Sequence, residues 1–162
     1  MTRFLAAMLA STCCGFLLGQ NAGSAPVSAP TGSPLRLGKF SVSLAVEDLA
    51  KSRTFYETLG FKVTGGEPAQ NWLILQNDSA TIGLFQGMFN KNMLTFVPGW
   101  DRDDKPLADF DDVRDIQKAL KSRGLSLMTE ADESSTGPAS LMLKDPDGNP
   151  ILLDQYVSKP KK

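Results

Sequence analysis

The stretch from Phe40 to Phe61, FSVSLAVEDLAKSRTFYETLGF, constrains the fold of this chain more than any other part of the sequence. Apolar residues alternate with small or polar ones at its start, which is typical of a half-buried strand: Val42, Leu44 and Val46. Asp48 is a good N-cap, the apolar residues after it recur at helical spacing, and Gly60 stands where a left-handed C-cap is needed. The stretch therefore predicts a strand, a tight turn, a helix and the beginning of a second strand.

The same pattern returns 64 positions later, where Asp112 matches Asp48 and Gly124 matches Gly60. In the first copy, further strand patterns fall at 61–66, 72–76 and 81–86. The second copy has a helix pattern at 113–122 and strand patterns at 93–97, 125–128, 139–143 and 151–156. This weak duplication predicts an α+β fold built from two paired βαβββ modules. We expect them to form a cupped, partly open mixed β-sheet, with the helices outside and a concave cavity inside.

Two residue counts restrict the chemistry of the chain. It contains no histidine, which excludes a His-based triad, a His general base and the commonest zinc or iron ligand. Its two cysteines, Cys13 and Cys14, both precede the predicted fold, so the folded part has neither a thiol nucleophile nor a disulfide. A net charge of -1 without a long basic run argues against nucleic acid as a partner.

The sequence divides into a leader, a linker, a domain and a tail. Arg3 and the apolar run from Phe4 to Leu18 favour a signal peptide within residues 1–30. The apolar run is too short to span a bilayer comfortably. We therefore expect an exported protein, periplasmic or secreted, without a stable membrane span after signal removal. A retained anchor, a cytosolic N-terminus and lipid attachment at Cys13 or Cys14 are the alternatives. The remaining parts are a flexible linker (31–38), a domain of two modules (39–157, divided into 39–90 and 91–157) and a basic tail (158–162).

Four short motifs resemble the vicinal oxygen chelate superfamily, which includes glyoxalases, bleomycin resistance proteins and extradiol dioxygenases. They are Val46-Glu47-Asp48-Leu49, Phe55-Tyr56, Leu59-Gly60-Phe61 and the turn DPDGNP at Asp145–Pro150. The resemblance covers about residues 39–156. It implies the paired βαβββ fold and, in the enzymes, a divalent metal held by His, Glu or Gln side chains that acts as a Lewis acid.

The sequence departs from the family at the implied metal-ligand positions, which fall at Ser41, Gly83, Asn92 and Leu152. None of these is a histidine or a carboxylate, and moving the register by two residues recovers only Asp154 as a carboxylate. Zinc, nickel and iron(II) need basic nitrogen, thiolate or carboxylate donors that converge on one point. We therefore expect neither a metal nor another cofactor, and we do not expect the family's usual isomerisation or ring cleavage.

Strand alternation predicts which side chains face the cavity. The predicted ligand-binding residues are mostly apolar or aromatic, with a few polar groups: Ser41, Ser43, Gly83, Phe85, Asn92, Leu94, Phe96, Trp100, Leu152 and Asp154. The same residues would also suit a packed core. Asp154, if buried, would have a raised pKa and could act as a general base, but no second carboxylate or nucleophile pairs with it in the sequence, so we name no catalytic residue.

These observations favour an exported glyoxalase-like protein that binds a small, partly apolar molecule in the sheet cavity without a metal. One alternative is an enzyme of the superfamily, a lyase, isomerase or dioxygenase with displaced metal ligands, or a metal-free enzyme that uses Asp154. Another is a structural or assembly module that uses the frame only for packing. The sequence leaves the oligomeric state open between a monomer and a homodimer.

Overall fold

The computed structural model describes residues 32–160, and the predicted signal peptide with Cys13 and Cys14 lies outside these residues. The first half contains β1 (Lys39–Val46), α1 (Leu49–Thr58), β2 (Lys62–Glu67), a 3-10 turn (Pro68–Gln70), β3 (Trp72–Gln76) and β4 (Thr81–Gln86). The second half contains β5 (Met93–Val97), α2 (Val113–Ser122), β6 (Leu127–Thr129), β7 (Ala139–Lys144) and β8 (Pro150–Gln155). This is the predicted order of two βαβββ modules.

All eight strands belong to one mixed sheet, in the order β2-β3-β4-β1-β5-β8-β7-β6. The two modules meet at its centre, where β1 pairs with β5 in antiparallel register. Within each module the first strand is parallel to the last of the same module, β1 to β4 and β5 to β8. β2 and β6 form the two edges, so the sheet is open, and the predicted α+β fold is confirmed.

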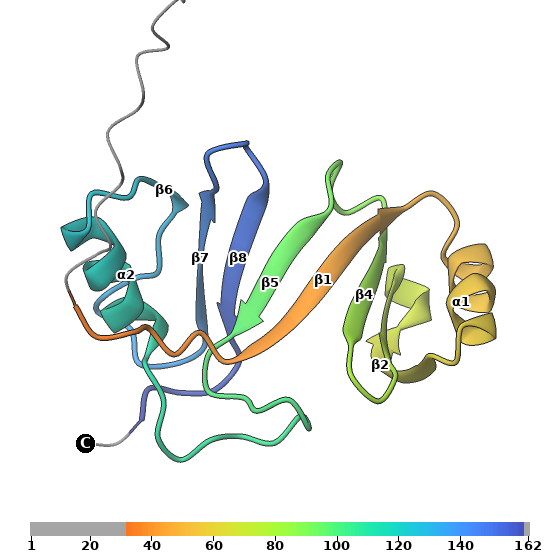
Figure 1. The fold of residues 1–162 in the computed structure, drawn as a ribbon, viewed down its shortest axis with the longest axis horizontal. Helices are drawn as coiled ribbons and strands as arrows, with labels where there is room; N and C mark the ends of the chain where they lie inside the picture. The colour runs from red at the N-terminus through yellow and green to blue at the C-terminus, as the bar shows by residue number, and fades with distance from the viewer. Residues whose placement is uncertain (1–31, 161–162) are drawn as a thin grey trace, which may run out of the picture. The chain divides into compact units, whose positions relative to one another are not determined.

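The two helices cover different parts of the sheet (Figure 1). α1 packs on β3 and β4, whereas α2 packs on β7 and β8. Asp48 and Asp112 cap these helices as predicted, because each carboxylate accepts a hydrogen bond from an amide of the first turn. The duplication in the sequence therefore corresponds to a real structural repeat.

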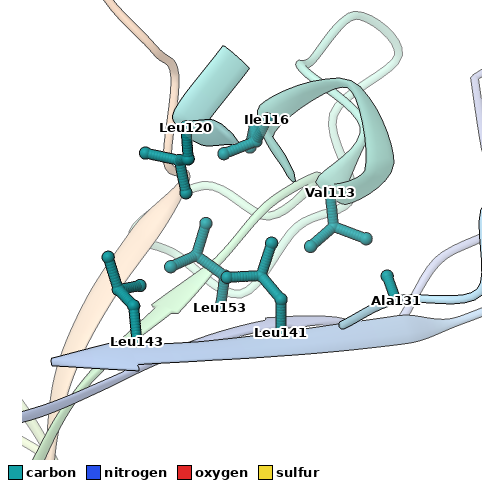
Figure 2. Packing of buried hydrophobic residues seen from close by; sticks show 7 residues of the cluster. All are labelled: Val113, Ile116, Leu120, Ala131, Leu141, Leu143 and Leu153. Carbon is teal, nitrogen blue, oxygen red and sulfur yellow. The ribbon is translucent and has the colours of Figure 1, made fainter. Parts of the chain in front are cut away.

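The second module has the better packed core. Val113, Ile116 and Leu120 on α2 point toward apolar side chains of β7 and β8, as Figure 2 shows. The cluster consists of Val113, Ile116, Leu120, Ala131, Leu141, Leu143 and Leu153, all less than 9% exposed. The core of the first module is Leu49, Leu73, Leu75, Ile82 and Leu84, and only Leu49 comes from its helix.

A buried polar network holds the N-terminus of α2 against the end of β8. Asp112 and Arg114 form an ion pair at 3.2 Å that is almost inaccessible to solvent. Gln155 donates to the Asp112 carboxylate at 2.9 Å and accepts from the amide of Val113 at 2.7 Å. Burial opposes ionisation of Asp112, but the hydrogen bonds from Gln155 and Arg114 outweigh it and lower the pKa of Asp112 below its usual range.

The residues just before β1, which the sequence assigns to a flexible linker, make specific contacts. Leu35 and Leu37 pack against the core of the second module. Arg36 forms ion pairs with Asp109 at 2.9 Å and with Asp111 at 3.0 Å. The packing of the domain therefore includes residues that precede Lys39. Among residues 32–160 no helix has the length and apolar character needed to cross a membrane.

Candidate functional site

One face of the sheet carries a cavity of about 700 Å³. Its position follows from strand alternation, because the helix-side residues Leu73, Leu75 and Leu84 fill the core of the first module while their neighbours along the strands point the other way. The lining residues come from both modules and from the loop after β5: Ser43, Thr64, Gly65, Gly66, Trp72, Ile74, Phe85, Met88, Phe89, Met93, Thr95, Trp100, Asp104, Met142, Leu152, Asp154 and Tyr156. This volume lies within the range of small-molecule sites, roughly 300–1,000 Å³.

Aromatic rings form one wall of the cavity. Trp72 on β3 stands opposite Phe85 on β4, and their rings are nearly parallel, with centroids 6.2 Å apart. Phe89, in the turn after β4, packs on Phe85 with centroids 5.3 Å apart. This wall presents flat apolar surfaces on which a planar molecule can stack.

The absence of a side chain at Gly83 makes room for this aromatic wall. A Cβ atom at position 83 would lie only 2.4 Å from Cε2 of Phe85 and 3.3 Å from Cδ1 of Ile74. The ring of Phe85 thus occupies the space that any larger residue at position 83 would need. Gly83 belongs to the cavity face of the sheet, but it lies beneath Phe85 and does not line the cavity.

Polar groups sit at separate points of the wall. The hydroxyl groups of Ser43 and Thr95 hydrogen-bond to each other at 2.8 Å across the junction of β1 and β5. Asp104, in the loop after β5, pairs with Lys39 and accepts a hydrogen bond from Gln76. These three residues, which we call the loop latch, connect the loop to β1 and β3.

Trp100 contributes an unpaired donor. Its Nε1 atom is buried and has no hydrogen-bond partner among the described residues. A buried donor without a partner costs about 1–3 kcal/mol, and such groups deserve a functional explanation.

Asp154 is the carboxyl group of greatest chemical interest. It lies on β8, and burial raises its pKa, while a hydrogen bond with the hydroxyl of Tyr156 acts in the opposite direction. Among residues 32–160 no lysine or arginine forms an ion pair with Asp154. The pKa of Tyr156 is also raised, first by burial and then by the neighbouring Asp154 carboxylate.

The structure brings five of the ten predicted residues to the cavity wall: Ser43, Phe85, Trp100, Leu152 and Asp154. Ser41 pairs with Thr95 and Gly83 pairs with Ser43, so both belong to the cavity face of the sheet, but neither borders the cavity. Whether any of these residues binds a ligand stays a prediction.

The orientation predicted for the start of the second module was wrong. Ser43 lies directly opposite Met93, and residues opposite each other share a face, so Met93 and Thr95 face the cavity. Leu94 and Phe96 point to the helix side, where Phe96 packs on the core. Asn92 lies outside the cavity and accepts a hydrogen bond from the amide of Ala45 at 3.0 Å. Because β5 is apolar on both faces, its alternation could not fix its orientation, and Thr95 was its only polar signal.

Several lining residues were not predicted. Met88 and Phe89 lie in a turn, and Asp104 lies in a loop, where alternation gives no information. Tyr156 was detectable, because it stands two residues from Asp154 and so shares its face. Trp72 and Ile74, which share one face of β3, were also not among the predicted residues.

The donor set does not fit the divalent metal that the family resemblance implies. Of the four expected ligand positions, Gly83 has no side chain, Leu152 is apolar and Asn92 lies outside the cavity. The hydroxyl groups near Ser41 are neutral donors, and Asp154 is the one carboxyl group of the cavity without an ion-pair partner in the described chain. Within residues 32–160 no three Asp, Glu, Cys or His residues gather in a way that could hold a metal.

Comparisons with known proteins agree with this architecture. The family model described as "Glyoxalase/Bleomycin resistance protein/Dioxygenase superfamily" matches residues 39–153. No curated protein matches the chain. Similar solved structures include a member of the same superfamily from Vibrio splendidus 12B01, which is 18% identical with a TM-score of 0.50, covering 72% of this chain and 97% of that one.

Two further solved structures are also similar to this chain. One is described as NAD-dependent benzaldehyde dehydrogenase from Legionella pneumophila, 16% identical with a TM-score of 0.53, covering 72% of this chain and 98% of that one. The other is an extradiol ring-cleaving dioxygenase from B. fuscum, 21% identical with a TM-score of 0.46, covering 79% of this chain and 34% of that one. At these identities the likeness concerns the fold, and the activities in the names belong to those proteins.

Proposed function

The chain belongs to the glyoxalase, bleomycin resistance protein and dioxygenase superfamily, and from this premise we propose that it binds a small, partly apolar molecule in the sheet cavity without a metal. The observation that carries the proposal is the cavity of about 700 Å³, whose wall is apolar and aromatic and whose polar groups lack a metal-ligand set. Sites of this size with a few placed polar groups are typical of small-molecule binding. Export to the periplasm or the exterior belongs to the same proposal and rests on the sequence of residues 1–30.

The distribution of polar groups supports binding over simple core packing. A packed core leaves few voids larger than a water molecule, whereas this cavity has room for a ligand. The hydroxyl pair of Ser43 and Thr95 and the Asp154 carboxyl group stand at different points of the wall. They would orient a ligand by a few hydrogen bonds, while the aromatic rings would supply most of the contact area.

Metal content is the first test. The chain without residues 1–30 is incubated with zinc, nickel, manganese and iron(II), desalted and analysed by elemental mass spectrometry. We expect close to zero metal per chain, because one carboxyl group and two hydroxyl groups make a poor site for these ions. About one metal per chain would contradict the proposal and would favour an enzyme with displaced ligands.

Ligand binding is the second test, and the chain carries its own probes. Its two tryptophans, Trp72 and Trp100, both line the cavity, so intrinsic fluorescence reports directly on occupancy. We expect saturable fluorescence changes with aromatic compounds, reduced in turn by Trp72→Phe and Trp100→Phe. The absence of any saturable response in a broad screen, together with the absence of metal, would favour the structural or assembly module.

A further inference from the structure

The cavity wall has an uneven charge. Its seventeen lining residues include the carboxyl groups of Asp104 and Asp154, but no lysine or arginine. Asp104 is already paired with Lys39, whose side chain is 7% exposed. Asp154 therefore leaves the cavity with one carboxyl group whose charge no neighbouring cation balances.

The groups around Asp154 do not supply this missing cation. β8 lies between β5 and β7, and the residue opposite Asp154 on β7 is Ser140. At the end of β8, the titratable neighbour of Asp154 is Tyr156, which is its hydrogen-bond partner and carries no positive charge. On β1 the Lys39 ammonium group, which belongs to the loop latch, is engaged by Asp104.

The aromatic wall has the same electrostatic preference as Asp154. The face of an aromatic ring carries partial negative charge and attracts ammonium groups, with Trp the strongest of the aromatic residues. Trp72, Phe85, Phe89, Trp100 and Tyr156 all line the cavity. Rings and carboxyl group thus both favour a cationic ligand and disfavour an anionic one.

From this arrangement we propose that the cavity selects ligands that join a planar apolar ring to a protonated amine, with the ring against the aromatic side chains of the cavity and the amine on the Asp154 carboxylate. This inference rests on the proposed function and narrows it to a class of ligand. A charge-assisted hydrogen bond between ammonium and carboxylate is roughly twice as strong as a neutral one. An organic acid of the same shape would instead bring a second negative charge next to Asp154.

The proposal has a consequence for pH. Because burial raises the pKa of Asp154 in the free protein, the carboxyl group keeps its proton to a higher pH than an exposed aspartate does. An ammonium group binds best to the ionised form, so the affinity for an amine should rise with pH as Asp154 loses its proton. A neutral ligand lacks this dependence.

Three probes of one shape test the inference by isothermal titration calorimetry: a naphthalene ring with an aminomethyl, a hydroxymethyl or a carboxylate substituent. At pH 7 we expect the amine to bind at least tenfold more tightly than the alcohol, and the carboxylate to bind more weakly than both. Asp154→Asn, which keeps the shape of the side chain, should bring the affinity for the amine down to that for the alcohol. Asp147→Asn is the matched control, because Asp147 lies in the exposed turn before β8, and it should leave all three affinities unchanged.

The outcomes separate this inference from the proposed function. Equal affinity for amine and alcohol, or an amine preference that survives Asp154→Asn, overturns the inference while binding of the ring still supports a small-molecule site. Binding of none of the three probes overturns both. If Asp154→Asn fails to fold, the pH dependence of binding to the unaltered protein tests the inference instead. A rise in the affinity for the amine between pH 4 and pH 7, with no change in the affinity for the alcohol, supports the inference. An affinity for the amine that does not change with pH overturns it.

Discussion

Gly83 shows how a single residue without a side chain shapes the cavity. Phe85 lies over it, in the space where a Cβ atom would stand 2.4 Å from the ring. The backbone of Gly83 has no positive φ, so the requirement comes from the close approach of the ring and not from backbone strain.

We predict that Gly83→Ala displaces the Phe85 ring and weakens binding of aromatic ligands at least tenfold. The fold should persist, because the displaced ring borders the cavity and has room to move. Titration followed by tryptophan fluorescence measures the effect. Gly137→Ala is the control, since nothing lies within 4 Å of a Cβ atom there, and equal affinity of the two variants would contradict the role assigned to Gly83.

Asp154 should reduce stability at neutral pH. Its pKa is higher in the folded protein than the ordinary value of 3.8, so the folded state holds the proton more tightly than the unfolded chain does. The contribution of this group to stability is therefore greatest below pH 3.8 and declines as the pH rises through the raised pKa.

We accordingly predict that Asp154→Asn is neutral or stabilising at pH 7, and that its advantage disappears toward pH 3. Urea denaturation of both proteins, followed by circular dichroism across this pH range, measures the difference. Such a gain is typical of residues kept for function at the expense of stability. A clear loss of stability at pH 7 would mean that Asp154 serves the fold.

At the scale of elements, the two helices contribute very differently. α2 buries five residues, whereas α1 buries only Leu49, and both Phe55 on α1 and the C-cap residue Leu59 are more than half exposed. Ile116→Ala should lower the free energy of unfolding by about 2–5 kcal/mol, because it opens a cavity in a closed core. Phe55→Ala should change it by less than about 1 kcal/mol. Chemical denaturation measures both, and similar losses for the two variants would show that Phe55 is covered in solution, for example by a second copy of the chain.

The loop between β5 and α2 should depend on the loop latch. Asp104 has a φ of 60°, unusual for a residue other than glycine, and its contacts with Lys39 and Gln76 hold it there. Lys39→Met preserves the length of the side chain but removes its charge, and we predict faster amide hydrogen exchange in the loop. Lys51→Met, which removes an exposed ion pair with Asp48, is the control. Unchanged exchange near Asp104 would show that other contacts, such as those of Arg36, suffice.

At the scale of the whole domain, stability should be unevenly distributed. All six residues of β2 are exposed, and the core of the first module is smaller than that of the second. We predict that native-state hydrogen exchange opens β2 and α1 first and β7, β8 and α2 last. Exchange followed by mass spectrometry on the intact protein tests this order. Simultaneous opening of all elements would show that the central pairing of β1 with β5 makes the sheet one cooperative unit.

The sequence by itself determined the order of the elements, the caps at Asp48 and Asp112 and the family of the fold, because these depend on local periodicity and on turn residues. It also determined that the expected metal-ligand positions lack suitable donors. Only the tertiary structure decided which face of β5 meets the cavity, since both faces of that strand are apolar and its orientation comes from pairing with β1. The same holds for Trp100 and Asp104, which reach the cavity from a loop without periodicity, and for Gly83, whose role depends on the position of the Phe85 ring. Strand pairing and the packing of side chains set these features, and local pattern does not encode them.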